Sequence, residues 1–329
     1  MFYIKFTLIY YTQFMKNQIE ILKKEISKQV IGHKEMIDSL LIGLLSEGHV
    51  LIEGVPGLAK TTAVNALSKS LGLSFHRVQF TADLLPSDIL GAEIYHTSTE
   101  SFELKKGPIF THLLLADEIN RASAKVQSAL LEVMQEKQVT IGDQTFKLED
   151  PFMVLATQNP IDQEGTYSLP EAQLDRFMFK IIVGYNTQSE EFEIAKKVAT
   201  KSFALINKVL SAVELKVMQK EVQKVYIDDE LIAYIVKLIF ATREPEAHGL
   251  EHLSNIIEFG ASPRATIDLL KAVKASAYLR GKSSVTPIDI MLCVKNVLRH
   301  RIVLSYDALV EETSTDDVID QLMQTLEMP

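Results

Sequence analysis

A glycine-containing stretch from Gly54 to Thr61 has the residue types and spacing of a loop that binds phosphate. Glycines allow backbone N–H groups to curl around an anion, and a helix that begins at the end of the loop adds the positive end of its dipole. We expect Lys60 to reach the β- and γ-phosphates of a nucleotide and the Thr61 hydroxyl to bind Mg²⁺. The candidate nucleotide-binding residues are Gly54, Val55, Pro56, Gly57, Leu58, Ala59, Lys60, Thr61 and Thr62.

The position of Ala59 departs from the usual pattern, which has a second glycine there. We expect a methyl group to be tolerated if this residue keeps a negative φ. The alternative interpretation of the stretch is an ordinary turn between a strand and a helix. The flanking segments disfavour it, because Val50–Glu53 reads as a buried strand and residues 62–71 read as an amphipathic helix.

Two adjacent carboxylates, Asp117 and Glu118, follow the apolar end of a second predicted strand, residues 109–116. Open parallel sheets place their sites at the carboxyl ends of the strands. We expect Asp117 to bind Mg²⁺ directly or through water, and Glu118 to act as the general base that activates the attacking water. Together with the phosphate loop, these acids predict hydrolysis of ATP rather than a strand that merely ends in solvated acids.

Three further polar residues are candidates, although each could also have an ordinary structural role. Asn159 follows the apolar strand 152–156 and could orient the attacking water, or could simply form a turn. Arg176 could be an ordinary cation at a helix C-terminus, or could reach the γ-phosphate of a neighbouring subunit in a ring. Arg264 follows Ser262, the expected N-cap, and Pro263, and a cation there is unfavourable for the helix dipole, which suggests a functional demand.

The elements around these residues predict an α/β core with a parallel sheet, followed by a helical lid. Within the core, residues 75–80 predict a further core strand and residues 81–91 a helical stretch with polar caps. Residues 93–95 and 101–104 predict one hairpin and residues 139–148 a second. The polar stretch after residue 183 is the best boundary, and everything beyond it reads as helical except an acidic tail from Glu311, expected to be loose. The predicted segments are 1–30, an uncertain N-terminal segment, 31–185, the nucleotide-binding core, and 186–329, the lid.

The composition is that of an ordinary globular protein of 329 residues, with 47% hydrophobic and 23% charged residues. A formal charge of −9 argues weakly against a surface devoted to nucleic acid. The single cysteine, the absence of an apolar run of membrane-spanning length, and an N-terminus without a small-residue cleavage site lead us to expect a cytoplasmic protein.

Five motifs in order make the chain from about Val30 onward resemble the MoxR branch of the AAA+ ATPases. The motifs are Gly54–Thr61, Asp117–Ala122, Thr157–Pro160, Glu171–Phe177 and Ser262–Arg264. Alanine in place of the second loop glycine is usual in this branch. The hairpin between residues 93 and 104 matches the helix-2 insert that this branch shares with magnesium chelatase and the minichromosome maintenance helicases. Residues 1–30 fall outside the resemblance.

The resemblance implies a role for each candidate residue. Lys60 and Thr61 correspond to Walker A, Asp117 and Glu118 to Walker B, Asn159 to sensor 1, Arg176 to the arginine finger and Arg264 to sensor 2. It further implies ATP and Mg²⁺ as cofactors, a hexameric ring, and a chaperone-like remodelling activity, often with a partner that carries a von Willebrand factor A domain.

Two other functions remain open at this point. The first is a nucleotide switch that assembles with ATP but hydrolyses it too slowly to do work, and Glu118 and Arg176 argue against it. The second is a DNA-dependent motor, which predicts a basic track. The insert hairpin offers only Lys105 and Lys106 among several glutamates, so nucleic acid is not the expected partner.

Overall fold

The computed structural model describes residues 17–98, 100–160, 166–200 and 202–329. The chain divides into two compact units, each discontinuous in sequence. The first unit comprises residues up to Asp38, 49–169 and 181–218, and the second comprises residues 39–48, 170–180 and 219–329. The predicted N-terminal segment lies partly outside the described residues, and residues 17–27 of it are helical. The domain limits expected from the sequence stay a prediction.

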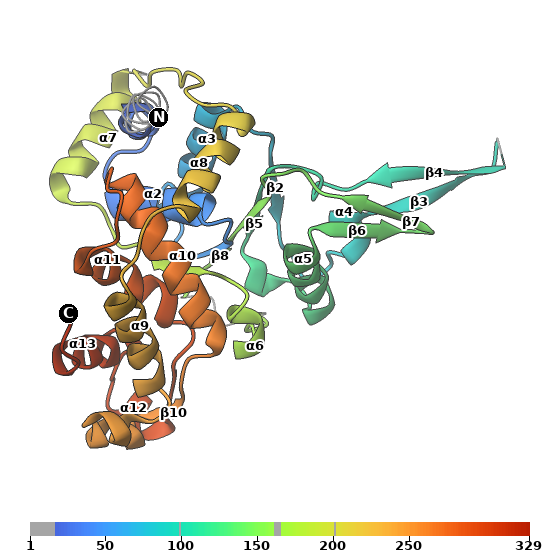
Figure 1. Cartoon of the computed structure of the whole chain (residues 1–329). Helices are drawn as coiled ribbons and strands as arrows, with labels where there is room; N and C mark the ends of the chain where they lie inside the picture. The colour runs from blue at the N-terminus through green and yellow to red at the C-terminus, as the bar shows by residue number, and fades with distance from the viewer. Residues whose placement is uncertain (1–16, 99, 161–165, 201) are drawn as a thin grey trace, which may run out of the picture. The chain divides into compact units, whose positions relative to one another are not determined.

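A five-stranded sheet of order β2-β5-β8-β1-β9 forms the α/β core that the sequence predicts (Figure 1). The strands are β1 (Val50–Glu53), β2 (Phe75–Gln79), β5 (Leu113–Asp117), β8 (Met153–Gln158) and β9 (Phe179–Ile182). Strands β2, β5, β8 and β1 pair in parallel. The central strands β5, β8 and β1 are buried almost throughout, as their continuous apolar runs require, whereas the edge strand β2 is partly exposed.

The helices of the two units are α2 (Lys34–Leu45), α3 (Lys60–Leu71), α4 (Pro86–Leu90), α5 (Ala124–Glu136), α6 (Glu171–Leu174), α7 (Gln188–Thr200), α8 (Ala212–Gln223), α9 (Asp229–Ala241), α10 (Pro263–Leu279), α11 (Pro287–Leu298), α12 (Tyr306–Val310) and α13 (Thr315–Thr325). Helices α3, α4, α5 and α7 belong to the first unit, and helices form most of the second unit. Helix α3, which leaves the phosphate loop, buries Val64, Leu67 and Leu71 on one face. It ends at Gly72, whose positive φ lets its N–H bond back to Lys69.

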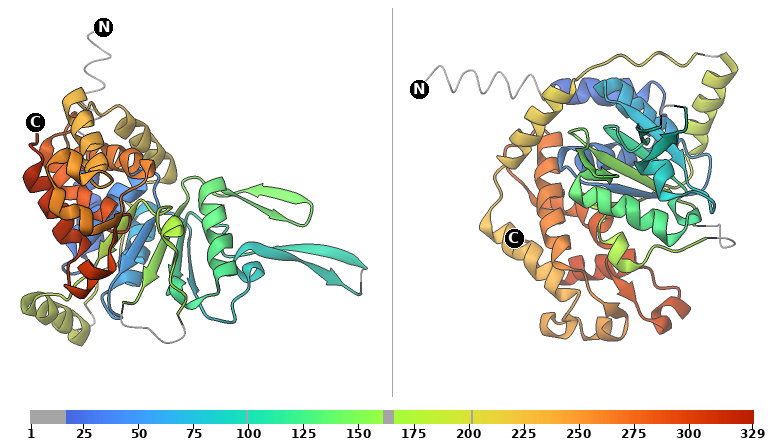
Figure 2. Two further views of the ribbon diagram at one scale, coloured as in Figure 1. Left: turned by 90° about the horizontal axis from the view of Figure 1, so that it is seen from below. Right: turned by 90° about the vertical axis from the view of Figure 1, so that its right-hand side faces the viewer.

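Two antiparallel hairpins project from the first unit, as predicted. They are β3 (Gly91–His96) with β4 (Ser101–Lys106), and β6 (Gln138–Ile141) with β7 (Gln144–Lys147). Figures 1 and 2 show both hairpins extending in the same direction. The Nζ atom of Lys106 lies 4.8 Å from the ring centroids of both Phe110 and Phe146. The Glu93 carboxylate lies against Gly142, in the turn at the tip of the β6–β7 hairpin, so the base of the first hairpin contacts the tip of the second.

Two predicted elements are shorter in the structure. The helix expected over residues 81–91 is only α4, because Pro86 lacks an N–H and occupies the first turn rather than the interior. The strand expected from residue 109 begins at Leu113, because Thr111 N–H donates to the carbonyl of Ile109 and closes a turn there.

In the second unit, α9, α10, α11 and α13 pack together, and a two-stranded sheet of β10 (Ile257–Phe259) and β11 (Val303–Leu304) interrupts the expected all-helical run. The expectation of a loose tail is wrong. Residues 315–325 form α13, which is capped by Ser314 and buries Val318, Ile319 and Leu322. Two of its acidic residues, Asp316 and Asp317, lie in the first turn, where the helix dipole favours negative charge.

A buried histidine precedes β1. The Nδ1 atom of His49 accepts a hydrogen bond from the Val154 N–H at 2.9 Å, and Nε2 lies 3.0 Å from the Met134 carbonyl oxygen, to which it can donate. Because burial disfavours the charged ring, the pKa of His49 falls from 6.5 to about 4. The neutral ring therefore links β8 to the end of α5.

We expect this histidine to make the protein less stable in mild acid. As the pH falls below 6.5, His49 becomes protonated in the unfolded chain, whereas in the folded chain it stays neutral until about pH 4. The contribution of His49 to the free energy of unfolding is therefore fully present above pH 6.5 and is lost as the pH falls toward 4. The loss reaches on the order of 3 kcal/mol. Urea unfolding of wild type and His49→Gln at pH 7.5 and 5 measures it. The free energy of unfolding of the variant should change less between the two pH values than that of wild type. An equal change in both proteins would contradict a buried, neutral His49.

Candidate active site

The phosphate loop between β1 and α3 is shaped by two glycines. A Cβ at Gly54 would lie 2.8 Å from the carbonyl oxygen of Val183, so only glycine fits this close approach. Gly57 has φ +89°, which favours glycine, and no atom lies within 4 Å of where its Cβ would be. The loop therefore leaves open space at its tip, as a cradle for an anion must.

Ala59 does not keep the negative φ expected from the sequence. It adopts φ 54° and ψ 18°, in the left-handed region, at the N-cap of α3. For an alanine this conformation costs on the order of 1 kcal/mol. Ala59 adopts this conformation because the chain must turn into α3 at this residue, and the Ala59 carbonyl accepts the N–H of Ala63 to begin the helix.

The ammonium group of Lys60 is held within its own loop. Its Nζ donates to the carbonyl oxygen of Gly54 at 2.6 Å. Burial lowers the pKa of Lys60 below its usual value, while the carboxylates of Asp117, Glu118 and Glu53 act in the opposite direction. A cation that is partly desolvated is well suited to receive a phosphate oxygen.

The two acids at the end of β5 lie beside the end of β8. Thr157 Oγ1 donates to Asp117 Oδ1 at 2.5 Å and accepts the backbone N–H of Glu118 at 2.9 Å. Glu118 adopts φ 56° and ψ 51°, a left-handed conformation that a non-glycine residue holds only where its surroundings enforce it. The predicted pair thus sits at the carboxyl edge of the sheet.

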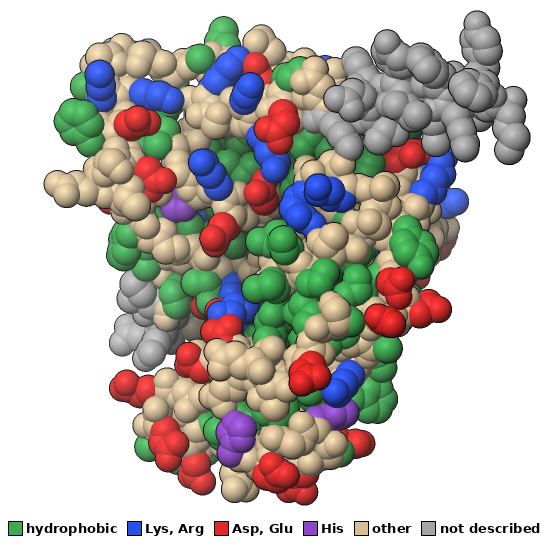
Figure 3. Space-filling model, turned by 60° about the vertical axis from the view of Figure 1, so that its left-hand side comes forward, with side chains coloured by type: hydrophobic (Ala, Val, Ile, Leu, Met, Phe, Trp, Pro, Cys, Tyr) green, Lys and Arg blue, Asp and Glu red, His purple; other side chains and the backbone are tan. Residues whose placement is uncertain are grey.

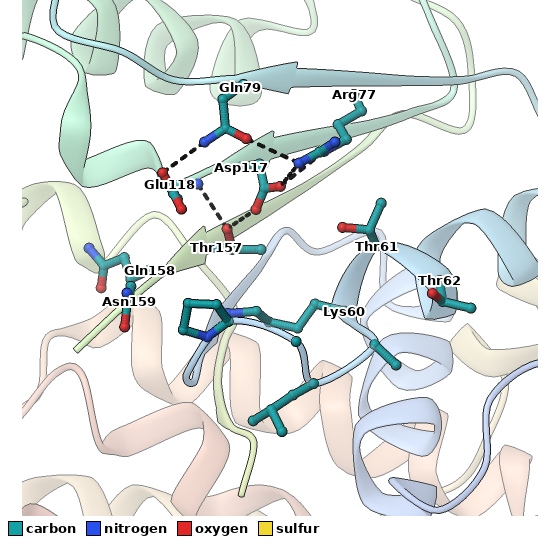
Figure 4. A pocket seen from close by; sticks show the side chains of 14 residues that line it. Lys60, Thr61, Thr62, Arg77, Gln79, Asp117, Glu118, Thr157, Gln158 and Asn159 are labelled. Atoms are coloured by element: carbon teal, nitrogen blue, oxygen red, sulfur yellow. Dashed lines mark hydrogen bonds and ion pairs between the residues drawn. The ribbon is translucent and has the colours of Figure 1, made fainter. Parts of the chain in front are cut away.

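Strand β2 contributes two residues that sequence reasoning missed. Arg77 donates to Asp117 Oδ2 from Nε at 2.9 Å and from Nη2 at 2.6 Å, and Gln79 Nε2 donates to Glu118 Oε2 at 2.8 Å (Figure 4). Arg121 Nε also lies 3.0 Å from Glu118 Oε2. The available signal was the alternation of polar residues in a strand expected to belong to the core.

These elements enclose a cavity of about 340 Å³. Its lining residues are Pro56, Gly57, Leu58, Ala59, Lys60, Thr61, Thr62, Arg77, Gln79, Asp117, Glu118, Thr157, Gln158 and Asn159 (Figure 4). The structure therefore brings the loop, both acids and Asn159 together. Gly54 and Val55 lie outside the lining, and the carbonyl oxygen of Gly54 accepts the hydrogen bond from Lys60 Nζ.

Arg176 and Arg264 belong to the second unit. Asp175 accepts hydrogen bonds from Ser262 Oγ at 2.9 and 3.0 Å and from Arg301 Nε at 2.8 Å, and Arg264 Nη1 lies 3.6 Å from it. Ser262 is the N-cap of α10 and Pro263 occupies the first turn, as predicted. The segment before Arg176 is thereby attached to the start of α10, while the roles of both arginines toward a nucleotide stay predictions.

The cavity fits a nucleotide phosphate with a hard cation. An open glycine cradle and a lysine suit phosphate oxygens, and the Thr61 hydroxyl and Asp117 carboxylate are oxygen ligands of the kind Mg²⁺ prefers. Within residues 17–98, 100–160, 166–200 and 202–329, no group of three or more His, Cys, Asp or Glu side chains could hold a metal alone. Mg²⁺ usually relies on one or two protein oxygens and on substrate phosphates, which agrees with this arrangement.

Two family models match the chain. Residues 49–179 match the ATPase family associated with various cellular activities (AAA), and residues 251–322 match the AAA lid domain. The chain is 47% identical to "Chaperone MoxR1" of Mycobacterium tuberculosis (strain ATCC 25618 / H37Rv) over 93% of this chain and 81% of that protein. It is 30% identical to "Protein MoxR" of Paracoccus denitrificans, over 91% and 93% of the two chains.

A crystal structure of a Cytophaga hutchinsonii ATCC 33406 protein superimposes with a TM-score of 0.93 at 47% identity, covering 98% of each chain. The parallel sheet, the phosphate loop and the lid define a P-loop ATPase of the AAA class. More narrowly, the chain belongs to the MoxR family of AAA ATPases. ATP binding and ATP hydrolysis are therefore its activity, and AAA proteins typically form oligomers.

No helix in the described part of the chain is long and apolar enough to cross a membrane.

Proposed function

We propose that the cavity hydrolyses ATP together with Mg²⁺, and that this hydrolysis drives remodelling of a partner protein in the cytoplasm. The observation that carries the proposal is the meeting of the glycine loop and the strand-end acids in one cavity. Mg²⁺ would be held by Thr61 and Asp117 and would supply charge neutralisation for the phosphates. A relative named as a chaperone supports the remodelling part of the proposal.

Each residue has a separate task in this proposal. The loop N–H groups from Gly57 to Thr62 bind the phosphates, and Lys60 exchanges its bond to Gly54 for a phosphate oxygen. Glu118 accepts the proton of the attacking water. Asn159, 8% exposed at the edge of the cavity, orients that water. Gln79 and Arg121 both contact Glu118 Oε2 and hold its carboxylate in place.

We further propose that the protein works as a ring, most simply a hexamer, in which Arg176 and Arg264 complete the ATPase sites. A partner with a von Willebrand factor A domain belongs to this proposal. A DNA-dependent motor is less well supported, because the insert hairpin carries only Lys105 and Lys106 among several glutamates. On the face shown in Figure 3, Lys and Arg side chains are likewise interspersed with Asp and Glu. ATP turnover that does not respond to added DNA would dismiss the motor.

Nucleotide binding by Lys60→Ala tests the site itself. We expect the affinity for a fluorescent ATP analogue to fall on the order of 100-fold, because a charge-assisted contact to the phosphates is lost. Lys69→Ala is the matched control, since Lys69 lies exposed in the last turn of the same helix. Equal affinities of Lys60→Ala and Lys69→Ala in a fluorescence titration would refute the assigned phosphate site.

A further inference from the structure

Asp117, the acid assigned to Mg²⁺, has both of its carboxylate oxygens engaged by protein groups. Oδ1 accepts from Thr157, and Oδ2 accepts two hydrogen bonds from the Arg77 guanidinium, at 2.9 and 2.6 Å. Figure 4 shows Arg77 reaching over Asp117 from the neighbouring strand β2. The register explains the reach, because Arg77 pairs with Leu115 and Gln79 with Asp117. The two N–H groups of this guanidinium fork converge on one carboxylate oxygen, and such charge-assisted hydrogen bonds are stronger than bonds between neutral groups.

The guanidinium and a metal ion would compete for the same oxygen. A carboxylate oxygen that accepts two N–H groups has few lone-pair directions left for a cation, and the two positive charges repel each other at short range. Thr157 offers no such conflict, because a neutral hydroxyl on Oδ1 can stay while Oδ2 changes partner. The contact that has to change is therefore the one made by Arg77.

Arg77 is placed so that it can leave. Its side chain is 49% exposed, whereas that of Asp117 is 14% exposed, and β2 lies at the edge of the sheet. An ion pair with one half-exposed partner is weak enough to be broken at modest cost. While it is in place it neutralises one of two adjacent acids, so that Asp117 and Glu118 do not repel an incoming phosphate without compensation.

We infer that Arg77 is a positioning residue that acts as a stand-in cation on Asp117 until Mg²⁺ enters with the nucleotide. The inference rests on the proposed function, in which Asp117 belongs to the Mg²⁺ site. It has two consequences. Arg77 raises the concentration of free Mg²⁺ that the site needs, and it supports nucleotide binding when Mg²⁺ is scarce.

The test is a Mg²⁺ titration of nucleotide binding by the full chain, with a fluorescent non-hydrolysable ATP analogue, so that turnover plays no part. In Arg77→Gln the half-saturating Mg²⁺ concentration should fall about tenfold, which corresponds to about 1.4 kcal/mol. With EDTA present, the same variant should bind the analogue several-fold more weakly than wild type, because the acids are then uncompensated. A half-saturating concentration that is unchanged or higher would overturn the inference.

Lys69→Gln is the matched control. It removes a cation from the exposed last turn of α3, outside the cavity, and its half-saturating Mg²⁺ concentration should stay within about twofold of wild type. Equal shifts in both variants would mean a general charge effect and would refute a specific role of Arg77. Arg77→Lys, which keeps the charge without the fork, should lie between wild type and Arg77→Gln. If Arg77→Gln fails to fold, an unshifted Arg77→Lys overturns the inference.

The proposed Mg²⁺ site and the role of Arg77 can be refuted separately. Nucleotide binding by wild type that is indifferent to Mg²⁺ would refute the proposed Mg²⁺ site and the inference with it. Mg²⁺-dependent binding by wild type, with no change in either Arg77 variant, would leave the proposed function intact and refute only the role of Arg77.

Discussion

Replacing Glu118 by Gln is expected to lower ATP turnover by about 10²- to 10⁴-fold while ATP remains bound. Glutamine keeps the size of the side chain and can still contact Gln79, but it cannot accept the proton of the attacking water. Lys60, the loop and Asp117 are unchanged, so the phosphates keep their partners. Initial rates at saturating ATP and Mg²⁺, set beside the affinity for a fluorescent ATP analogue, separate these two effects.

Glu132→Gln provides the control for this prediction. Glu132 lies exposed on α5 outside the cavity, so its substitution makes the same chemical change without touching the site. Turnover of Glu118→Gln within tenfold of the control would contradict a general base at this position. The same variant, loaded with ATP, should also retain a remodelled partner for identification by pull-down.

The second large effect is expected at Arg176. Arg176→Ala should bind ATP normally and lose on the order of 10³-fold or more in turnover, because an arginine that stabilises the charge on the transferring phosphoryl group contributes at least that much. The residue follows α6, where Asp175 is anchored by the buried Arg301, so its backbone is firmly positioned. Turnover and nucleotide affinity of the purified oligomer measure the two halves of the prediction.

Mixing experiments test whether Arg176 acts on a neighbouring subunit. Arg176→Ala and Lys60→Ala subunits, each inactive alone, should regain activity when mixed, because some interfaces then pair an intact loop with an intact arginine. Lys60→Ala mixed with the Lys60→Ala/Arg176→Ala double variant provides the control, since no subunit in that mixture has an intact loop. An absence of recovery in mixtures that demonstrably co-assemble would count against action between subunits.

Much of the core and part of the site could be predicted from the sequence, because both depend on local order along the chain. The apolar run of β1, the glycine loop and the amphipathic α3 follow one another without interruption, so the site they form needs no distant partner to be recognised. The same holds for Asp117 and Glu118, which end a continuous apolar strand, and for the hairpins, whose alternation is visible residue by residue.

Only the tertiary structure decided which residues face those acids. Arg77 and Gln79 reach Asp117 and Glu118 because β2 lies next to β5 in the sheet, and neither pairing nor register can be read from either strand alone. The left-handed φ of Ala59 likewise depends on where α3 must begin.

In the second unit, too, local features could be predicted from the sequence and long-range contacts could not. The N-cap of α10 at Ser262 and Pro263 was determined by the sequence, because a cap depends on neighbouring residues. The contact of Arg301 with Asp175 joins residues 126 positions apart, and α13 is ordered by the burial of Val318, Ile319 and Leu322. The sequence alone thus determined most of the core elements and the chemistry they carry. The packing of distant segments decided the partners of each charged group, because those partners depend on strand order and burial rather than on spacing along the chain.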